Sequence, residues 1–188
     1  YTMRGIHFFD VLNGIAVGQG GEIMRTTDGG DTWTLETSPT TNSLLGLFVQ
    51  GDLMLAMGNG GIVLRSTNGG ANWTAQTLDL QDLYSAWIDP SGIGLLTGKG
   101  RVFRTVDFGA TWTPVQLGTY HSMLNKVSFG TDQNGASAGW QTMGGFENGV
   151  LRTTNGGRTW SNATAGNSQW LGVHLLANGT GWLGGGVG

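Results

Sequence analysis

The chain has 188 residues, a net charge of −3 and no cysteine, and charged residues make up only 11% of it. Because phosphate backbones are bound through clustered Lys and Arg, this composition argues against nucleic acid as a partner. The lack of cysteine excludes disulfides and thiolate metal sites, and no apolar run approaches the roughly 18 residues that would span a bilayer.

The first repeat has the pattern of one four-stranded sheet. Short apolar or alternating runs at 6–9, 14–18, 22–27 and 33–36 are separated by glycine-rich turns. Glycine occurs 36 times in the chain, far above its usual share of about 7%. Each run is a predicted strand, and the glycines mark the turns between them. In the first run we expect Ile6 and Phe8 to face the core.

The same pattern returns along the chain with a fixed motif, Ser/Thr-x-Asp/Asn-x-Gly-x-Thr/Asn-Trp. Its tryptophans are 40, 39 and 48 residues apart, a period that suits one propeller blade of four strands per repeat. We therefore predict an all-β chain, a β-propeller of four-stranded antiparallel blades with about four and a half blades present. The expected blades are 1–40, 41–80, 81–118, 119–166 and, in part, 167–188.

The third strand of each repeat is apolar at adjacent positions, so both of its faces should be covered, as they are when blades pack radially. The fifth repeat ends after two predicted strands. We expect either a fragment of a longer propeller, as the start without Met also suggests, or a partner subunit that covers the open end.

The motif falls between the third and fourth strands, where an Asp or Asn side chain accepts from backbone N–H groups and glycines permit positive φ. The final Trp would anchor the turn on the sheet. We favour this structural role over ligand binding. The residues concerned are Thr26, Asp28, Gly30, Thr32, Trp33, Ser66, Asn68, Gly70, Asn72, Trp73, Thr105, Asp107, Gly109, Thr111, Trp112, Thr153, Asn155, Gly157, Thr159 and Trp160.

The motif is the Asp-box, or bacterial neuraminidase repeat, and the longer segment 18–33 resembles the Ycf48-like photosystem II assembly factor family position by position. The resemblance implies a seven-bladed propeller in the whole protein. It also implies an exported location, which would be extracellular, cell-surface, periplasmic or in the thylakoid lumen. Family members act as non-enzymatic scaffolds, so we expect recognition of a protein partner.

Asp-box propellers also include sialidases and other glycosidases, which leaves a carbohydrate-binding or glycosidase-derived propeller as the alternative. Ordinary glycosidases need two opposed carboxylates, and no such pair stands out among the 12 acids of the chain. We expect no enzyme in this chain, no cofactor and no metal site, although catalytic residues of a hydrolase could lie outside it. In the glycan alternative, Trp140, Phe146 and Trp182 would be stacking platforms.

Two features are candidates for partner binding. An arginine precedes every Asp-box, and these four could form a basic patch or could cap adjacent turns; they are Arg25, Arg65, Arg104 and Arg152. The fourth repeat has a longer connection at 140–148, where Trp140, Met143 and Phe146 either fold onto the blade or contact a partner.

Overall fold

A computed structural model describes residues 2–117, 123–131, 133–140, 150–163 and 169–186. In these residues the regular structure consists of strands and two short 3-10 turns, η1 (Gln19–Gly21) and η2 (Asn59–Gly61). None of the described helices is long and apolar enough to cross a membrane. The all-β prediction is confirmed. The chain divides into two compact units, Tyr1–Leu83 and Tyr84–Gly188, which are described separately.

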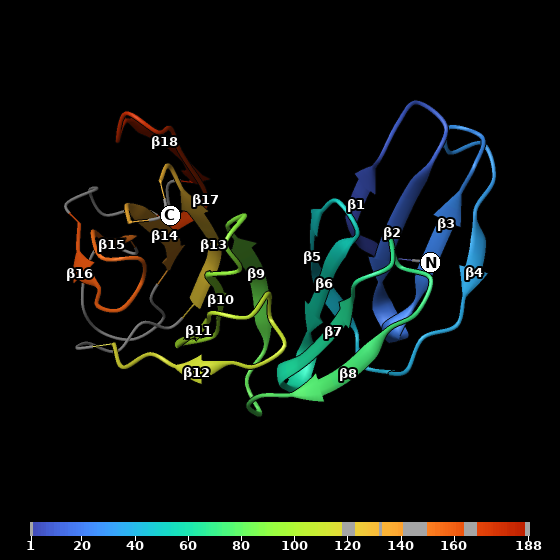
Figure 1. The fold of residues 1–188 in the computed structure, drawn as a ribbon, viewed down its shortest axis with the longest axis horizontal. Coiled ribbons are helices and arrows are strands. Elements are labelled where there is room, and N and C mark those ends of the chain that lie inside the picture. The colour runs from blue at the N-terminus through green and yellow to red at the C-terminus, as the bar shows by residue number, and fades with distance from the viewer. Residues whose placement is uncertain (1, 118–122, 132, 141–149, 164–168, 187–188) are drawn as a thin grey trace. The chain divides into compact units, whose positions relative to one another are not determined.

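The first unit contains two four-stranded antiparallel sheets (Figure 1). In each sheet the strands follow one another in chain order, so that every connection is a hairpin. The first sheet consists of β1 (Met3–Phe8), β2 (Gly14–Gly18), β3 (Ile23–Thr26) and β4 (Thr34–Glu36). The second consists of β5 (Leu44–Gln50), β6 (Leu53–Gly58), β7 (Ile62–Ser66) and β8 (Thr74–Thr77).

The core of the first unit lies between these two sheets. Ile15, Val17 and Ile23 of the first sheet form one buried cluster with residues of the second sheet. Leu47 and Val49 of β5 pack against this cluster. The second and third strands of both sheets are almost wholly buried, which confirms the prediction that the third strand is covered on both faces.

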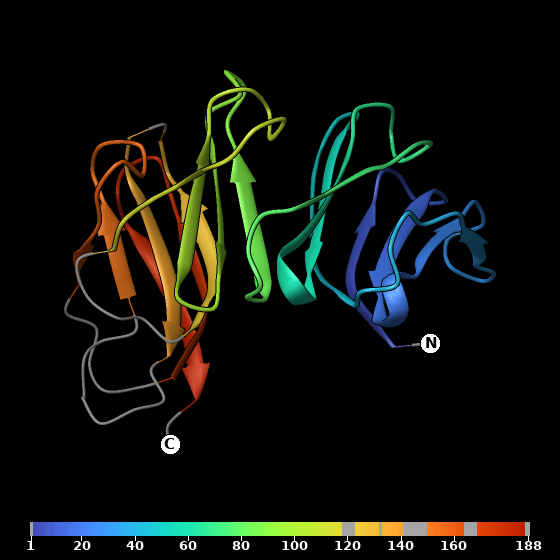
Figure 2. The same ribbon diagram turned by 90° about the horizontal axis from the view of Figure 1, so that it is seen from below.

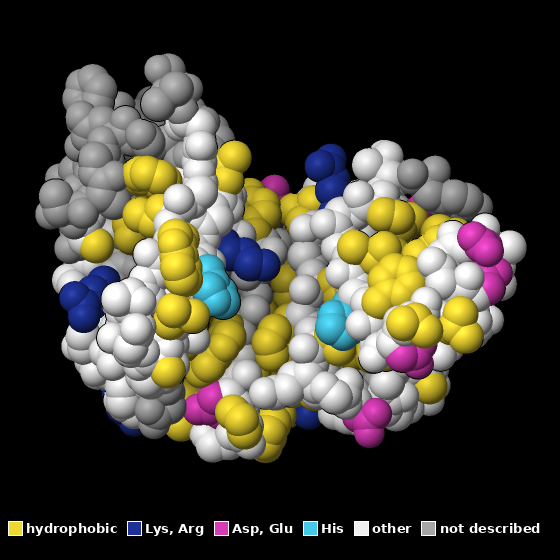
Figure 3. Space-filling model, turned by 90° about the horizontal axis from the view of Figure 1, so that it is seen from above, with side chains coloured by type: hydrophobic (Ala, Val, Ile, Leu, Met, Phe, Trp, Pro, Cys, Tyr) yellow, Lys and Arg dark blue, Asp and Glu magenta, His cyan; other side chains and the backbone are white. Residues whose placement is uncertain are grey.

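One expectation about the first strand is wrong in this unit. Ile6 and Phe8 were expected to face the core, but they are 61% and 40% exposed. Their counterparts in the second sheet, Leu47 and Val49, are covered because the first sheet packs on them. Within the described residues of this unit, no other sheet packs on the outer side of β1. Hydrophobic side chains are visible on the surface of this unit, at the right in Figure 3.

The second unit contains two further four-stranded antiparallel sheets and one two-stranded sheet, seen from below in Figure 2. The third sheet consists of β9 (Leu83–Ile88), β10 (Gly94–Gly98), β11 (Arg101–Thr105) and β12 (Thr113–Pro114). The fourth consists of β13 (Met123–Phe129), β14 (Gly135–Trp140), β15 (Val150–Thr153) and β16 (Ser161–Asn162). The fifth consists of β17 (Gln169–Leu175) and β18 (Gly181–Gly186).

Two clusters form the core of this unit. Leu95 and Val102 of the third sheet pack with Leu124 and Val127 of the fourth. Ala138 of the fourth sheet packs with Val173 of the fifth. Four four-stranded sheets and one two-stranded sheet in the described residues confirm the predicted number of about four and a half repeats.

Candidate functional site

The Asp-box turn between β3 and β4 is held by two side chains. The Thr26 hydroxyl donates to Asp28 at 2.7 Å and accepts from the Gly30 N–H at 3.0 Å. The Asp28 carboxylate also accepts from the Thr32 N–H at 2.9 Å and from the Thr32 hydroxyl. These hydrogen bonds stabilise the ionised carboxylate, with the Thr32 hydroxyl first among them, and lower the Asp28 pKa to about 2.

The third box has the same arrangement. Asp107 accepts from the Thr111 hydroxyl and N–H, and these bonds, the hydroxyl first, lower its pKa to about 2. Phe108 stands where the other boxes have glycine and has a φ of 58°. Its N–H donates to the Gly92 carbonyl in the neighbouring hairpin turn of the same sheet. The box turn is therefore bound to the sheet through its backbone as well as through its carboxylate.

The fourth box, which has Asn155 in place of the Asp, differs in the direction of one hydrogen bond. In the fourth box the Asn155 carbonyl oxygen accepts from the Thr159 N–H at 3.0 Å. This contact fixes the orientation of the amide, so that its NH₂ group donates to the Thr159 hydroxyl oxygen at 2.7 Å. The hydroxyl of Thr159 thus accepts in this turn, whereas those of Thr32 and Thr111 donate.

The box tryptophans contact the sheet that carries them. The Trp33 indole N–H donates to the Gly30 carbonyl at 3.1 Å, and its ring meets Phe8 of β1 edge to face. Trp160 makes the corresponding bond to Gly157 at 3.2 Å and meets Phe129 in the same way. In these two boxes the tryptophan thus joins the box turn to the first strand of the same sheet. In the other two boxes the indole nitrogens are buried without a partner among the described residues; they belong to Trp73 and Trp112.

Two of the arginines that precede the boxes lie against the box of the following sheet in the same unit. Arg25 of β3 donates through Nη2 to the Gly69 carbonyl in the second box at 2.8 Å, and its Nε lies 3.7 Å from Glu36. Arg104 of β11 donates through Nε to the Gly156 carbonyl in the fourth box at 3.1 Å. Arg65 is half-buried, whereas Arg152 is exposed. Two of the four arginines therefore cap a neighbouring turn, and whether any of them binds a partner stays a prediction.

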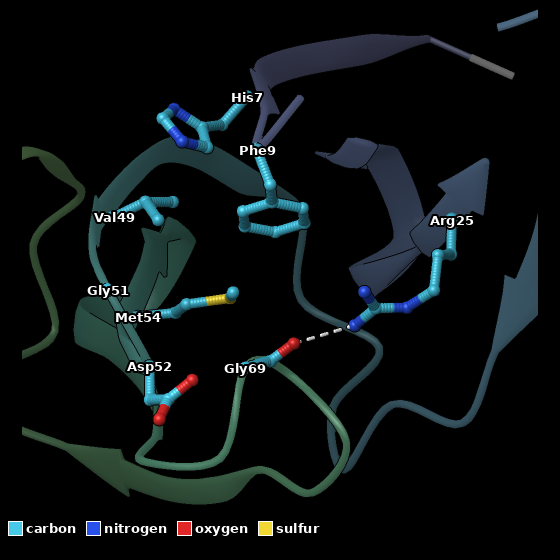
Figure 4. Close-up of a pocket in the computed structure, with 8 residues that line it drawn as sticks. All are labelled: His7, Phe9, Arg25, Val49, Gly51, Asp52, Met54 and Gly69. Atoms are coloured by element: carbon cyan, nitrogen blue, oxygen red, sulfur yellow. Dashed lines mark hydrogen bonds between the residues drawn. The ribbon is translucent and has the colours of Figure 1, made fainter. Parts of the chain in front are cut away.

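A pocket of about 540 Å³ lies in the first unit beside the Arg25–Gly69 contact (Figure 4). The close-up shows the Phe9 ring and the Met54 side chain directed into it, with Val49 and His7 beside them and Asp52 at its edge. We call it the first-unit pocket. It is lined by His7, Phe9, Arg25, Val49, Gly51, Asp52, Met54 and Gly69.

A second pocket, of about 490 Å³, lies in the second unit at the corresponding contact, where Arg104 meets the fourth box. It contains a second arginine, Arg158, from within that box. We call it the arginine pocket. It is lined by Arg104, Thr105, Val106, Thr111, Thr113, Pro114, Val115, Gln116, Arg158 and Thr159.

The structure describes only part of the other candidate residues, which are the aromatic and Met side chains expected to contact a partner or a sugar. Met143 and Phe146 lie outside the described residues, and Trp140 is placed only by its backbone, which pairs with Met123 at the end of β14. The ring of His174 stacks on Trp182. Among the described residues no group of three or more His, Cys, Asp or Glu side chains could hold a metal ion.

The sequence analysis missed Phe9, Asp52 and Arg158 as pocket residues. A signal existed for Arg158, because the corresponding position of the other boxes is Asp31, Ala71 or Ala110. Phe9 and Asp52 come from turns of different sheets. Only their packing brings them to one cavity.

Comparison with known proteins gives the family. A family model described as photosynthesis system II assembly factor YCF48 matches residues 1–125, which is more than half of the chain. The chain belongs to this family. A search of curated proteins found no match.

The fold is that of solved structures in the same family. A structure of YCF48 bound to D1 peptide has a TM-score of 0.69 at 20% identity, covering 97% of this chain and 59% of that one. YCF48 from Cyanidioschyzon merolae has a TM-score of 0.68 at 18% identity, covering 97% of this chain and 63% of that one. The chain thus spans about three-fifths of the length of these relatives. Its sheets are blades of a β-propeller.

The fold also occurs in an enzyme. An ancestral GH74 enzyme has a TM-score of 0.74 at 17% identity, covering 95% of this chain and 26% of that one. At this identity the likeness concerns the fold alone, and a propeller fold hosts unrelated functions. Function therefore has to be argued from the residues of this chain.

Proposed function

We propose that this family member is a non-catalytic, exported propeller scaffold that binds a segment of a protein partner. The observation that carries the proposal is the first-unit pocket, which lies within the residues that the assembly-factor family model matches. Its volume of about 540 Å³ is in the range of cavities that hold a small ligand or a few side chains.

The lining of this pocket suits a peptide segment. Phe9 is 38% exposed, and together with Met54 and Val49 it offers an apolar surface to an apolar side chain. Arg25 and Asp52 supply opposite charges in the same cavity, which favours a ligand that has polar backbone groups beside its apolar side chain. Peptides combine these two properties.

Three acids of the described residues support the non-catalytic part of the proposal. Asp28 and Asp107 accept hydrogen bonds inside the box turns, and these bonds keep them ionised. Asp10 accepts from the side-chain amide of Asn13 and then from the N–H groups of Asn13 and Leu12 in the β1–β2 turn, and these bonds lower its pKa. A glycosidase needs one carboxyl group that remains protonated to act as an acid, and these three have the opposite shift.

A peptide array tests the proposal. The first probe is a D1 peptide, because a YCF48 structure was solved with one, and random 12-residue peptides are the general probe. Phe9→Ala should weaken the bound peptides about tenfold, since it removes one buried aromatic contact. Val11→Ala is the matched control, because Val11 is exposed in the same turn but does not line the pocket.

Two results would contradict peptide recognition in the first-unit pocket. One is an array on which no peptide binds saturably. The other is a set of bound peptides whose affinities fall equally in Phe9→Ala and Val11→Ala. The exported location is tested separately, by fractionation of the source cells with an antibody to the protein, and recovery in the cytoplasmic fraction would contradict it.

A carbohydrate-binding propeller is the second candidate function, and one observation favours it. Trp182 of β18 is 62% exposed, and an exposed indole face is a surface on which a sugar ring could stack. A glycan array that compares the protein with Trp182→Ala separates the two functions. Saturable sugar binding that is lost in the variant supports the second candidate, and no sugar binding contradicts it.

A further inference from the structure

The arginine pocket holds two cations that have no acidic group within 4.0 Å among the described residues. Arg104 donates through Nε to the Gly156 carbonyl, which leaves both of its terminal NH₂ groups for other acceptors. Arg158 donates through Nη1 to the Asn155 carbonyl at 3.3 Å. No acid in the described part of the chain lies within 4.0 Å of either guanidinium group.

Electrostatics in this pocket favour an added negative charge. Partial burial and then the positive charge of Arg158 lower the pKa of Arg104, while the charge of Asp89 acts in the opposite direction. The Oδ1 atom of Asp89 accepts from the Ser91 N–H and hydroxyl and from the Ile93 N–H in the β9–β10 turn, and Asp89 makes no ion pair within 4.0 Å of Arg104 or Arg158. Two like charges are therefore held together without full compensation.

The corresponding contact in the first unit lacks this arrangement. There Arg25 lies 3.7 Å from Glu36, which pairs with Ile23 across the sheet. In the third sheet the residue in the place of Glu36 is Val115, whose N–H donates to Val102. The first unit also has Ala71 where the fourth box has Arg158. Compared with the corresponding contact of the first unit, the arginine pocket therefore has one acidic side chain fewer, because Val115 replaces Glu36. It has one basic side chain more, because Arg158 replaces Ala71.

The fourth box adds a neutral donor. Because the Asn155 amide donates to the Thr159 oxygen, the hydroxyl hydrogen of Thr159 is not used within the turn. In the boxes with Asp, the same hydrogen is donated to the carboxylate. Thr159 lines the pocket together with both arginines.

We propose that the arginine pocket is a binding site for an oxyanion, a carboxylate, sulfate or phosphate group that accepts hydrogen bonds from Arg104, Arg158 and Thr159. Guanidinium groups match the planar edges of such groups and bind them through charge-assisted hydrogen bonds. The site requires no peptide in the first-unit pocket, and it lies in the other unit. It therefore goes beyond the peptide recognition proposed above.

The test uses the full chain, labelled with ¹⁵N, and inorganic sulfate as the probe. Sulfate replaces chloride at constant ionic strength while the backbone amide signals are recorded. We expect saturable shifts at Arg158 and Thr159. Arg158→Gln should weaken sulfate binding about tenfold, the effect of one charge-assisted hydrogen bond. Arg4→Gln, an exposed arginine of β1, has the same charge change and should leave the affinity unaltered.

A second pair of variants tests the role of the Thr159 hydroxyl. Asn155→Asp places a carboxylate that takes the hydroxyl hydrogen and adds a negative charge, so sulfate binding should weaken about tenfold. Asn68→Asp makes the same change in the second box, in the first unit, and should have no effect on binding. Far-ultraviolet circular dichroism and the melting temperature show whether each variant is folded.

Shifts that do not saturate, or an affinity that is unchanged in Arg158→Gln or in Asn155→Asp, would overturn the proposal. Competition then identifies the source of the oxyanion. Displacement of sulfate by glutamate assigns the site to carboxylates, and displacement by O-phosphoserine alone assigns it to phosphate esters. If neither displaces saturably bound sulfate, the site is assigned to sulfate groups. None of these outcomes depends on the Phe9→Ala experiment.

Discussion

Arg25 and Gly69 are 44 residues apart in the chain, yet the Arg25 Nη2 donates to the Gly69 carbonyl oxygen at 2.8 Å. The bond joins the third strand of one blade to the Asp-box of the next. Arg104 and Gly156 repeat it in the second unit at 3.1 Å. Because the motif places an arginine before every box, this contact is a candidate structural reason for that arginine.

Arg25→Met should lower the free energy of unfolding by about 1 kcal/mol, because it removes one partly exposed charged hydrogen bond while keeping most of the packing of the side chain. Arg152→Met is the control, since Arg152 is exposed and makes no hydrogen bond to a described residue through its side chain. Its effect should stay within about 0.5 kcal/mol. Urea denaturation measures both, and equal losses would contradict a structural role of Arg25.

Thr26→Val should lower the free energy of unfolding by about 2 kcal/mol. Thr26 is buried, and its hydroxyl accepts from the Gly30 N–H and donates to Asp28, so the variant leaves the part-buried Gly30 N–H without its acceptor. Thr27→Val, at the exposed neighbouring position, should be nearly neutral. If thermal unfolding shows the two variants to be alike, the hydroxyl does not hold the turn.

The Asp-boxes predict a dependence of stability on acid pH. Asp28 and Asp107 have pKa values of about 2, below their usual 3.8, so folding favours their ionised forms. The stabilisation is present above about pH 4 and is lost as the pH falls through 2. The melting temperature of the double variant with Asp28→Asn and Asp107→Asn should therefore fall less steeply between pH 6 and 2 than that of the unaltered protein. Parallel profiles would show that these carboxylates have ordinary pKa values.

Two adjacent glycines of η2 should respond differently to alanine. Both have positive φ, 63° at Gly60 and 70° at Gly61, which costs an L-residue about 1 kcal/mol. A Cβ on Gly60 would have space, whereas one on Gly61 would lie 2.0 Å from the Asp79 carbonyl oxygen. We expect a loss of about 1 kcal/mol for Gly60→Ala and of at least about 3 kcal/mol for Gly61→Ala.

Urea unfolding at one pH measures this pair. Because the two substitutions are chemically identical and differ in position by one residue, their difference reports the close approach of the backbone around Asp79. Equal losses would show that the chain around Asp79 moves away without cost.

Much of the local structure could be predicted because its causes lie close together in the chain. In the first box, Thr26, Asp28 and Thr32 hydrogen-bond across no more than four residues, so their spacing is sufficient to identify the turn. In the first repeat the strand boundaries differed by at most three residues, and those of the run 14–18 agreed with β2. Trp33, for example, precedes β4 and does not lie in it, and its ring packs edge to face on Phe8.

The pockets could not be predicted in the same way. The exposure of Ile6 and the burial of Leu47 follow from which sheet face another sheet covers, although both residues occupy the same position in the repeat. Likewise, Arg158 and Arg104 are in different repeats, and their proximity depends on how two sheets pack.

The sequence by itself determined the repeated sheets and their box turns, because strand periodicity and Asp-box hydrogen bonds act over a few residues. Only the tertiary structure decided which side chains of neighbouring sheets meet: Phe9 with Asp52 and Arg25 in one pocket, and Arg104 with Arg158 in the other. The physical reason is that apolar burial brings the sheets together without regard to the charges at their ends. In the first-unit pocket the charge of Arg25 is compensated by Glu36. In the arginine pocket Arg104 and Arg158 have no acidic group within 4.0 Å among the described residues.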